Sequence, residues 1–230
     1  MLGTLKVKFF IATADLLEKI RGYYRARNMY VADVRGNYFE YLFEIKDISE
    51  KDSEFMIPPF AASHFAGTGE SIMEEYLKEI AVGRGVTVSV AESCSGGQVA
   101  DRITNVPGSS NYFIGSVVAY SNQMKVSQLG VSEGAIRDFG AVSAVVAEEM
   151  AGGIAGITGS DYALSITGVA GPEGGTEEKP VGTVWFGIVT PFGRERKRIQ
   201  FAGTRQEIKR KVSSFAIFNL MKAIRSGGNL

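Results

Sequence analysis

Hydroxyl, thiol and amine side chains lie in or beside three short glycine-containing segments of this 230-residue sequence. The first segment, AESCSGG at 91–97, follows the apolar run VTVSVA and precedes a predicted helix. Backbone amides at a helix N-terminus can bind an anion or an oxyanion without any special side chain. Because glycine-rich turns between a strand and a helix are common, the local pattern alone favours a structural role.

The second segment covers residues 107–131 and contains two serines, a tyrosine and a lysine. Ser109 and Ser110 precede a predicted strand that ends in Tyr120, and Lys125 lies just inside the next predicted helix. A lysine can act as a base when burial lowers its pKa from about 10.4 towards neutrality. The simpler alternative, which the local pattern favours, is a solvated Lys125 and serines that cap a secondary-structure element.

The third segment, TGVAGPEGGTEEKPVGTV at 167–184, is rich in glycine. It has neither the lysine pattern of a P-loop nor the G-x-G-x-x-G of a dinucleotide-binding turn. A long glycine loop in a compact domain is usually functional or mobile. Close approach of the backbone to a ligand is one physical reason for so few side chains.

The supply of histidine and cysteine limits the possible chemistry. The sequence contains one histidine, His64, and one cysteine, Cys94. Two such widely spaced residues do not form a zinc site of the usual ligands, so we expect no metal site. A Ser-His-Asp mechanism would need His64 as its base, and His64 lies in an expected connector. If the protein is a hydrolase, another group must take the proton; Cys94 is expected to be a small buried apolar residue.

Composition and charge are those of an ordinary globular protein. The 25 basic side chains balance 25 acidic ones, so no net field attracts nucleic acid or a membrane surface. No apolar run approaches the roughly 18 residues of a membrane span, and the N-terminal stretch does not resemble a signal peptide. A single cysteine permits no internal disulfide, which favours a reducing compartment. We therefore expect a cytoplasmic protein that binds neither nucleic acid nor a membrane.

The first 57 residues predict a small β-α-β-β unit. The apolar pattern predicts, in order, a strand at 7–11, a helix capped by Thr13, a strand at 29–34, a turn at Arg35-Gly36-Asn37 and a return strand from Phe39 to Ile45. So small a unit is marginal alone, and we expect it to pack on the main domain or on another subunit. The polar and Pro-Pro stretch that follows predicts a linker over 58–74, with a helix beginning near Ser71.

Residues 75–230 predict a second domain in which strands and helices interleave. Strands are expected at 86–91, 113–120, 161–167, 182–190 and 194–202, with a long helix from 143 and a C-terminal helix from Thr204. This order predicts an α/β fold with a mixed β-sheet covered by helices. The last two strands are expected to form an antiparallel hairpin.

The motifs of this second domain, taken together, resemble the CinA C-terminal domain family. The matching segments, in order, are AESCSGG, VPGSSNYFIGSVVAYSNQMK, FGAVS, SITGVAGPEGGTEEKPVGTVWFG and FAGTR. The resemblance covers about residues 75–225 and implies a three-layer α/β domain. Stand-alone members of the family are nicotinamide mononucleotide deamidases, so the resemblance also implies metal-independent hydrolysis of a carboxamide, without a cofactor.

The same resemblance implies which residues form the site. Carried over by position, the catalytic residues are Ser93, Ser110, Tyr120 and Lys125, and Arg205 is the arginine that binds the phosphate. Ser95 stands where many members have threonine. The further substrate contacts are expected at the glycines of the two glycine-rich loops, which are Gly96, Gly97, Gly171, Gly174 and Gly175.

These residues suggest a serine–lysine mechanism, since a Ser-Lys pair can attack an amide without histidine. We expect Ser110 to be the nucleophile and Lys125 the base, with Ser93 and Tyr120 relaying or orienting. Exchanging the roles of Ser93 and Ser110 remains open at this stage.

The expected partners are a small nucleotide substrate and further copies of the chain in a homo-oligomer. The alternatives are a catalytically silent nucleotide-binding module and a protein that recruits a partner through its N-terminal unit. Residues 1–74 do not resemble the larger molybdopterin-binding-like domain of full-length CinA proteins, and their role stays unassigned.

Overall fold

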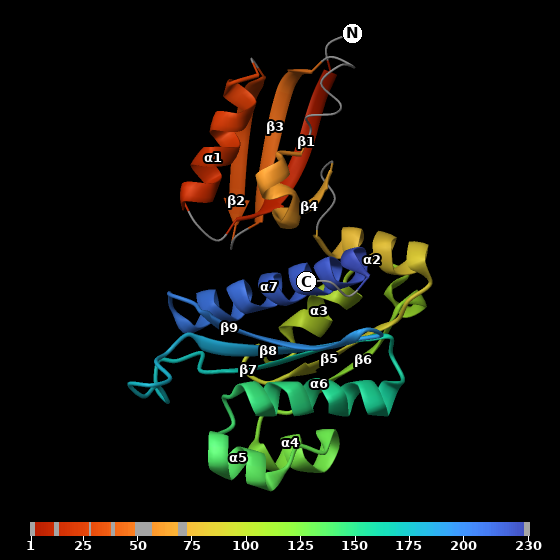
Figure 1. The fold of residues 1–230 in the computed structure, drawn as a ribbon, viewed down its shortest axis with the longest axis vertical. Helices are drawn as coiled ribbons and strands as arrows, with labels where there is room; N and C mark the ends of the chain where they lie inside the picture. Colours follow the sequence, from red (N-terminus) through yellow and green to blue (C-terminus); the bar gives the residue numbers. More distant parts are fainter. Residues whose placement is uncertain are drawn as a thin grey trace. The chain divides into compact units, whose positions relative to one another are not determined.

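The chain divides into two compact units, Met1–Tyr76 and Leu77–Leu230, in the computed structural model. The structure describes residues 3–11, 14–27, 29–37, 40–48, 57–68 and 73–227 (Figure 1). The expected cap at Thr13, Phe39 of the return strand and the expected helix start at Ser71 lie outside these residues.

The first unit is a four-stranded antiparallel sheet with one helix packed on it. Its elements are β1 (Gly3–Phe10), α1 (Ala14–Arg25), β2 (Tyr30–Asn37), β3 (Glu40–Ile48), the 3-10 helix η2 (Pro59–His64) and β4 (Phe65–Thr68). The strand order is β2-β3-β1-β4, which is the order of a split β-α-β arrangement. The apolar core of the unit includes Val7, Phe9, Ile20, Tyr24 and Phe43, all fully buried.

Two expectations for this unit are wrong. Residues 59–68 are not linker, because they form η2 and β4, and β4 pairs with β1. Phe65 of β4 packs edge-on against Phe9, so this short strand joins the core although its four residues are too few to show a period. Arg35, Gly36 and Asn37 belong to β2 and pair with β3, so they are not the expected turn.

The second unit contains a five-stranded mixed sheet in the order β6-β5-β7-β8-β9. Its strands are β5 (Val88–Glu92), β6 (Phe113–Val118), β7 (Tyr162–Gly168), β8 (Thr183–Thr190) and β9 (Gly193–Gln200). Strands β5, β6 and β7 run parallel, whereas β8 and β9 continue the sheet in antiparallel pairing. The predicted mixed sheet and the predicted β8–β9 hairpin are therefore confirmed.

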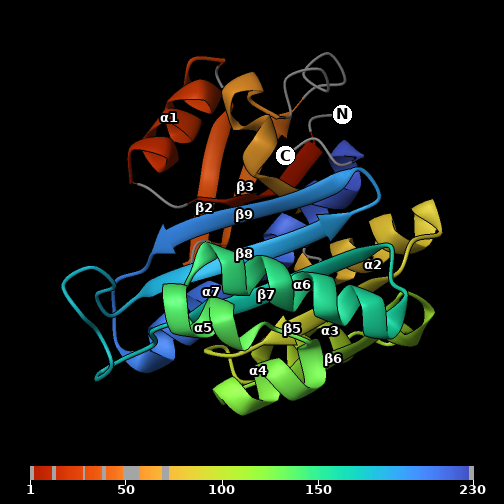
Figure 2. The same cartoon turned by 60° about the horizontal axis from the view of Figure 1, so that its bottom comes forward.

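Helices cover both faces of this sheet and make the three layers (Figures 1 and 2). The helical elements are α2 (Met73–Arg84), α3 (Gln98–Thr104), η3 (Ser109–Asn111), α4 (Asn122–Leu129), α5 (Glu133–Phe139), α6 (Ala144–Thr158) and α7 (Arg205–Ser226). Helices α4, α5 and α6 lie on one face, and α3 and α7 lie on the other. Among the described helices, none is both long enough and apolar enough to cross a membrane.

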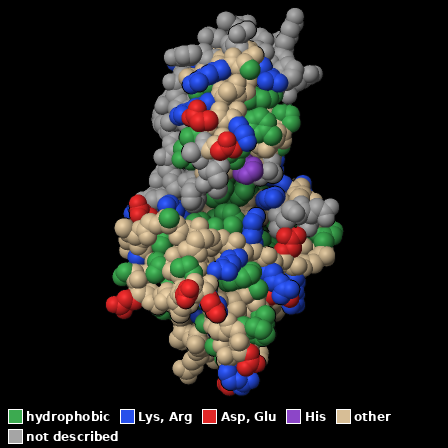
Figure 3. All heavy atoms as spheres, turned by 60° about the vertical axis from the view of Figure 1, so that its left-hand side comes forward, with side chains coloured by type: hydrophobic (Ala, Val, Ile, Leu, Met, Phe, Trp, Pro, Cys, Tyr) green, Lys and Arg blue, Asp and Glu red, His purple; other side chains and the backbone are tan. Residues whose placement is uncertain are grey.

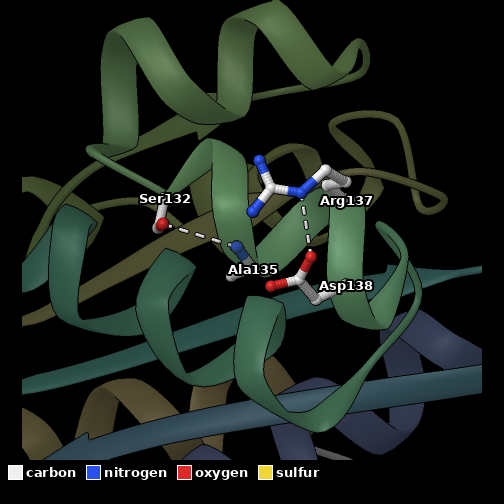
Figure 4. Close-up of polar contacts among 4 residues, drawn as sticks. All are labelled: Ser132, Ala135, Arg137 and Asp138. Atoms are coloured by element: carbon white, nitrogen blue, oxygen red, sulfur yellow. Dashed lines mark hydrogen bonds and ion pairs between the residues drawn. The ribbon is translucent and has the colours of Figure 1, made fainter.

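Short polar residues fix where these helices begin. Ser121, Ser132 and Ser143 cap α4, α5 and α6 by accepting a backbone N–H from the first turn. Figure 4 shows the cap of α5, in which Ala135 N donates to Ser132 Oγ, beside an ion pair between Arg137 and Asp138. A cap of this kind stabilises a helix by about 1 kcal/mol. The cap at Ser121 fixes the start of α4, the helix that carries Lys125.

The parallel strands determine where a site can form. Because β5, β6 and β7 run in the same direction, the loops that follow them lie together at the carboxyl ends of the three strands. Open α/β sheets bind ligands beyond the carboxyl ends of their parallel strands. The residues after these three strands are therefore the place to look for chemistry.

Candidate functional site

A cavity of about 270 Å³ lies at the carboxyl ends of these parallel strands. Its lining comes from the turn after β5, the segment from the end of β6 into α4, the loop before α6, the end of β7 with the glycine-rich loop after it, and the first residue of α7. These residues are Ser93, Cys94, Tyr120, Asn122, Lys125, Ala141, Val142, Thr167, Gly168, Val169, Ala170, Gly171, Glu173, Gly174 and Arg205. Four of the five polar residues implied by the family resemblance thus come together in one cavity.

Lys125 is the most buried charged group of the cavity, with 2% of its surface exposed. Its Nζ donates to Ser93 Oγ at 3.0 Å and to two backbone carbonyls, Ala119 O at 2.9 Å and Tyr120 O at 3.4 Å. All three acceptors are uncharged oxygens. Burial therefore dominates and lowers the pKa of Lys125 below its ordinary value, while the neighbouring Cys94 acts weakly in the opposite sense.

Ser93, which is 7% exposed, is the side chain that meets the lysine. It follows directly on β5, and the preceding residue, Glu92, anchors the turn. The buried Glu92 carboxylate accepts the backbone N–H groups of Val99 at 3.2 Å and Ala100 at 2.9 Å. These are unpaired donors of the first turn of α3. Glu92 thereby ties the end of β5 to the start of α3 and holds the serine between them.

Cys94 lines the same cavity as this pair and is buried. It is a free cysteine with 6% of its surface exposed. Burial raises the pKa of the Cys94 thiol to about 12, so the thiolate that would react is scarce at neutral pH. The expectation of a small buried apolar residue is confirmed.

Arg205 also lines the cavity, as the first residue of α7. Its guanidinium donates to Gly171 O at 2.6 Å and to Tyr120 Oη at 2.7 Å. It therefore connects the glycine-rich loop after β7 to the end of β6. Thr204 and Glu207 form a capping box that fixes the start of the helix.

Ser110 lies elsewhere in the chain. It is exposed, in η3, before the N-terminal end of β6. Ser93 follows the C-terminal end of β5, and β5 is parallel to β6. The two serines therefore lie at opposite ends of these parallel strands, Ser93 beyond the carboxyl ends and Ser110 before the amino ends. Within one chain the structure therefore does not pair Ser110 with Lys125, and the lysine meets Ser93 instead.

Only some of the five glycines expected to contact the substrate line the cavity. Gly171 and Gly174 line the cavity, but Gly96, Gly97 and Gly175 do not. Gly96 and Gly97 have φ of 64° and 88°, a left-handed conformation that makes the turn before α3. A Cβ at Gly175 would lie 2.8 Å from the backbone N of Val181, so this glycine allows the loop to close on itself.

Several lining residues were not singled out from the sequence. Asn122, Thr167 and Glu173 each stand inside a motif that the family resemblance used, but no role was assigned to them. Thr167 donates its hydroxyl to Ala141 O at 2.8 Å, which joins β7 to the loop before α6. The available signal was their position near the end of β7, in the glycine-rich loop after it, or at the start of α4, where polar residues are common for structural reasons.

A second cavity among the described residues lacks this combination of groups. A larger cavity of about 520 Å³ lies between α4 and α5, and its lining includes Val126, Ile136 and Arg137 but no lysine–serine pair. His64, the purple side chain in Figure 3, is half-buried in the first unit. It is not among the residues that line the described site. In the part of the chain that the structure describes, no group of three His, Cys, Asp or Glu side chains could hold a metal ion.

Comparison with known proteins places most of the chain in one family. A family model described as the CinA C-terminal domain matches residues 70–224. A CinA-like protein of Kosmotoga olearia is 42% identical over 179 residues, which are 78% of this chain and 41% of that protein. A CinA-like protein of Desulfotalea psychrophila is 49% identical over 146 residues, 64% of this chain and 35% of that protein. The chain thus spans less than half the length of these relatives.

Solved structures agree with the fold of the second unit. A CinA superfamily protein from Klebsiella pneumoniae has a TM-score of 0.64 and 30% identity, over 66% of this chain and 96% of that one. A competence/damage-inducible protein from Agrobacterium tumefaciens has a TM-score of 0.63 and 34% identity, over 66% and 94% of the two chains.

Proposed function

This chain belongs to the CinA C-terminal domain family, and we propose that its second unit is an amidohydrolase acting on nicotinamide mononucleotide. The products would be nicotinate mononucleotide and ammonia. The observation that carries the proposal is the 3.0 Å contact between Lys125 Nζ and Ser93 Oγ inside a cavity. A buried lysine with a lowered pKa beside a serine hydroxyl is the arrangement that an amide hydrolase without a catalytic histidine requires.

The contact supports Ser93, the alternative that the sequence left open, as the nucleophile. Ser93 Oγ would attack the carboxamide carbon while its proton passes to the neutral amine of Lys125. Collapse of the tetrahedral intermediate would break the C–N bond, and Lys125 would return the proton to the leaving ammonia. Water would then attack the ester on Ser93 with Lys125 again as base, which releases the carboxylic acid and restores the serine.

The part of the cavity lined by Arg205 is suited to the phosphate. Arg205 presents a planar fork of donors, which fits phosphate oxygens, and it stands at the N-terminus of α7, where the helix dipole favours negative charge. We propose that Arg205 binds the 5′-phosphate. The Tyr120 hydroxyl, which accepts from the guanidinium at 2.7 Å, would orient it.

The test is ammonia release from nicotinamide mononucleotide by the full chain, with nicotinamide and NAD as comparison substrates. We expect release from the mononucleotide, a much slower reaction with nicotinamide, which lacks the phosphate, and loss of the reaction in Ser93→Ala. No release from the mononucleotide by folded protein would exclude the activity. Binding of the mononucleotide without ammonia release would instead identify a silent nucleotide-binding module.

A further inference from the structure

The cavity of the second unit is lined by one acidic side chain, that of Glu173. The basic side chains of the lining are those of Lys125 and Arg205, and the other described lining residues are uncharged. Lys125 is buried, and its lowered pKa favours the neutral amine. A glutamate carboxylate and an arginine guanidinium are both charged at neutral pH. The cavity therefore offers one negative and one positive charge to a ligand.

The glycine-rich loop holds these two charges close to each other. Arg205 donates to Gly171 O at 2.6 Å, and Glu173 is two residues further along the same loop. Two residues of chain span at most about 7 Å. The loop is also tied down beyond the glutamate, where Lys179 Nζ donates to Phe139 O at 2.6 Å. A ligand whose anion is bound by the guanidinium thus lies within reach of the carboxylate.

The proposed substrate carries two charges of the opposite sense. In nicotinamide mononucleotide the ring nitrogen is bonded to the ribose, so the ring is a permanent cation, and the 5′-phosphate is an anion. The ring nitrogen lies between the carboxamide, which must reach Ser93, and the phosphate, which Arg205 is proposed to bind. A ligand held at both ends therefore brings its ring cation into the cavity that Glu173 lines.

We propose that Glu173 recognises the positive charge of the nicotinamide ring and makes the site selective for the cationic ring over an uncharged one. This inference rests on the proposed function and adds a specificity-determining residue to it. Glu173 is exposed, so water weakens its attraction for the ring. We expect the carboxylate to contribute about tenfold in affinity, which corresponds to about 1.4 kcal/mol.

The same carboxylate favours release of the product. Hydrolysis converts the neutral carboxamide into a carboxylate, so the ring system of nicotinate mononucleotide carries no net charge. Repulsion between the new carboxylate and Glu173 offsets the attraction that held the ring of the substrate. We therefore expect the site to bind the substrate more tightly than the product, and Glu173→Gln to narrow this difference.

The test compares nicotinamide mononucleotide with its reduced form, whose dihydropyridine ring is uncharged. Dissociation constants are measured by calorimetry on the full chain carrying Ser93→Ala, so that neither ligand is consumed. Glu173→Gln in this background should weaken the cationic ligand about tenfold and the reduced one by less than about twofold. Glu173→Asp, which keeps the charge, should retain most of the preference. Glu177→Gln is the matched control, exposed in the same loop but not among the lining residues, and should change neither constant.

Equal weakening of both ligands by Glu173→Gln would overturn the charge selection, because a carboxylate that binds the ribose or supports the loop acts on both alike. The ammonia assay on the chain with Ser93 intact separates this result from a failure of the proposed function. Ammonia release together with equal weakening would remove the inference and leave the function standing. Selective weakening of the cationic ligand without ammonia release would support the inference and remove only the reaction. A folded chain that binds neither ligand would overturn both.

Discussion

Burying an ammonium group away from water costs free energy, and Lys125 is buried among neutral oxygens only. This cost favours the neutral amine, which is the form that can take a proton from Ser93. The two side chains should therefore act as one catalytic unit.

Ser93→Ala and Lys125→Ala should each lower kcat by about a thousandfold or more, and the double variant should be little worse, because members of one catalytic unit are not additive. Ammonia release under single-turnover conditions measures this. Ser95→Ala is the matched control in the same turn. Its buried hydroxyl has no hydrogen-bond partner within the described residues, so its loss should leave the rate nearly unchanged. Additive losses at Ser93 and Lys125 would contradict the pairing.

The lowered pKa of Lys125 also sets the direction of the pH dependence. Below that pKa the amine is protonated and cannot accept the serine proton, so kcat/KM should rise with pH through it. Because burial lowers the pKa, the midpoint of this rise should lie below the ordinary value for lysine. Tyr120→Phe should keep the same rise, since it leaves Lys125 in place. A rate independent of pH across this range would rule out Lys125 as the base.

Arg205→Ala should discriminate between a nucleotide and its nucleoside. Losing a charge-assisted contact to a largely desolvated phosphate costs about 2–5 kcal/mol, by analogy with truncating one partner of a buried charge pair. This corresponds to a drop of about 30-fold or more in kcat/KM for nicotinamide mononucleotide. The dephosphorylated nucleoside should lose much less. Equal losses would mean that Arg205 acts through its contacts to Gly171 and Tyr120 and does not bind the phosphate.

At the scale of elements, the position of Lys125 depends on how α4 packs on α6. The two helices approach closely at Gly153, where an added Cβ would lie 1.9 Å from Leu129 O at the end of α4. Backbone at that distance cannot give way as a flexible side chain can. The glycine is therefore required for α4 to lie where it does.

Gly153→Ala should displace α4, lower the free energy of unfolding by about 1–3 kcal/mol through overpacking, and lower kcat. Thermal unfolding and the ammonia assay measure the two effects. Gly156→Ala is the matched control, three residues further along the same helix, with nothing within 4 Å of the added Cβ. It should raise stability by about 0.5–1 kcal/mol, because alanine favours a helix interior more than glycine does. Similar behaviour of the two variants would contradict the packing argument.

At the scale of the whole molecule, we expect the proposed reaction to depend on the second unit alone. All residues that line the cavity lie between Ser93 and Arg205, and the family match covers 70–224. The first unit has its own apolar core and its own sheet. We therefore expect the first unit to be dispensable for the proposed chemistry.

A chain of residues 71–230 should keep its turnover per folded molecule, since it retains α2 and every lining residue of the cavity. Circular dichroism and sedimentation establish that the shortened chain folds and assembles like the full one, and the ammonia assay then compares the rates. Loss of activity in a shortened chain that passes both checks would show that the first unit contributes to the site.

Much of the second unit's architecture could be predicted from the sequence because it depends on local patterns. Apolar strands, capped helices and glycine turns follow from residues near one another in the chain, and they predicted the mixed sheet and its final hairpin. Lys125 and Arg205 could be identified as candidates for the same reason, because their motifs are short. The four-residue strand β4 was missed, since its place in a sheet comes from pairing with β1 and from no period of its own.

Which serine meets the lysine was decided only by the tertiary structure. Ser93 and Ser110 are both hydroxyls beside a strand, and Ser110 is the nearer to Lys125 in sequence. Parallel pairing of β5 and β6 brings the carboxyl ends of both strands together, so Ser93 reaches Lys125. Ser110 precedes β6 and is therefore left at the amino ends of the strands. The direction of a strand relative to its neighbour depends on contacts between distant segments, and no local pattern in the sequence carries it.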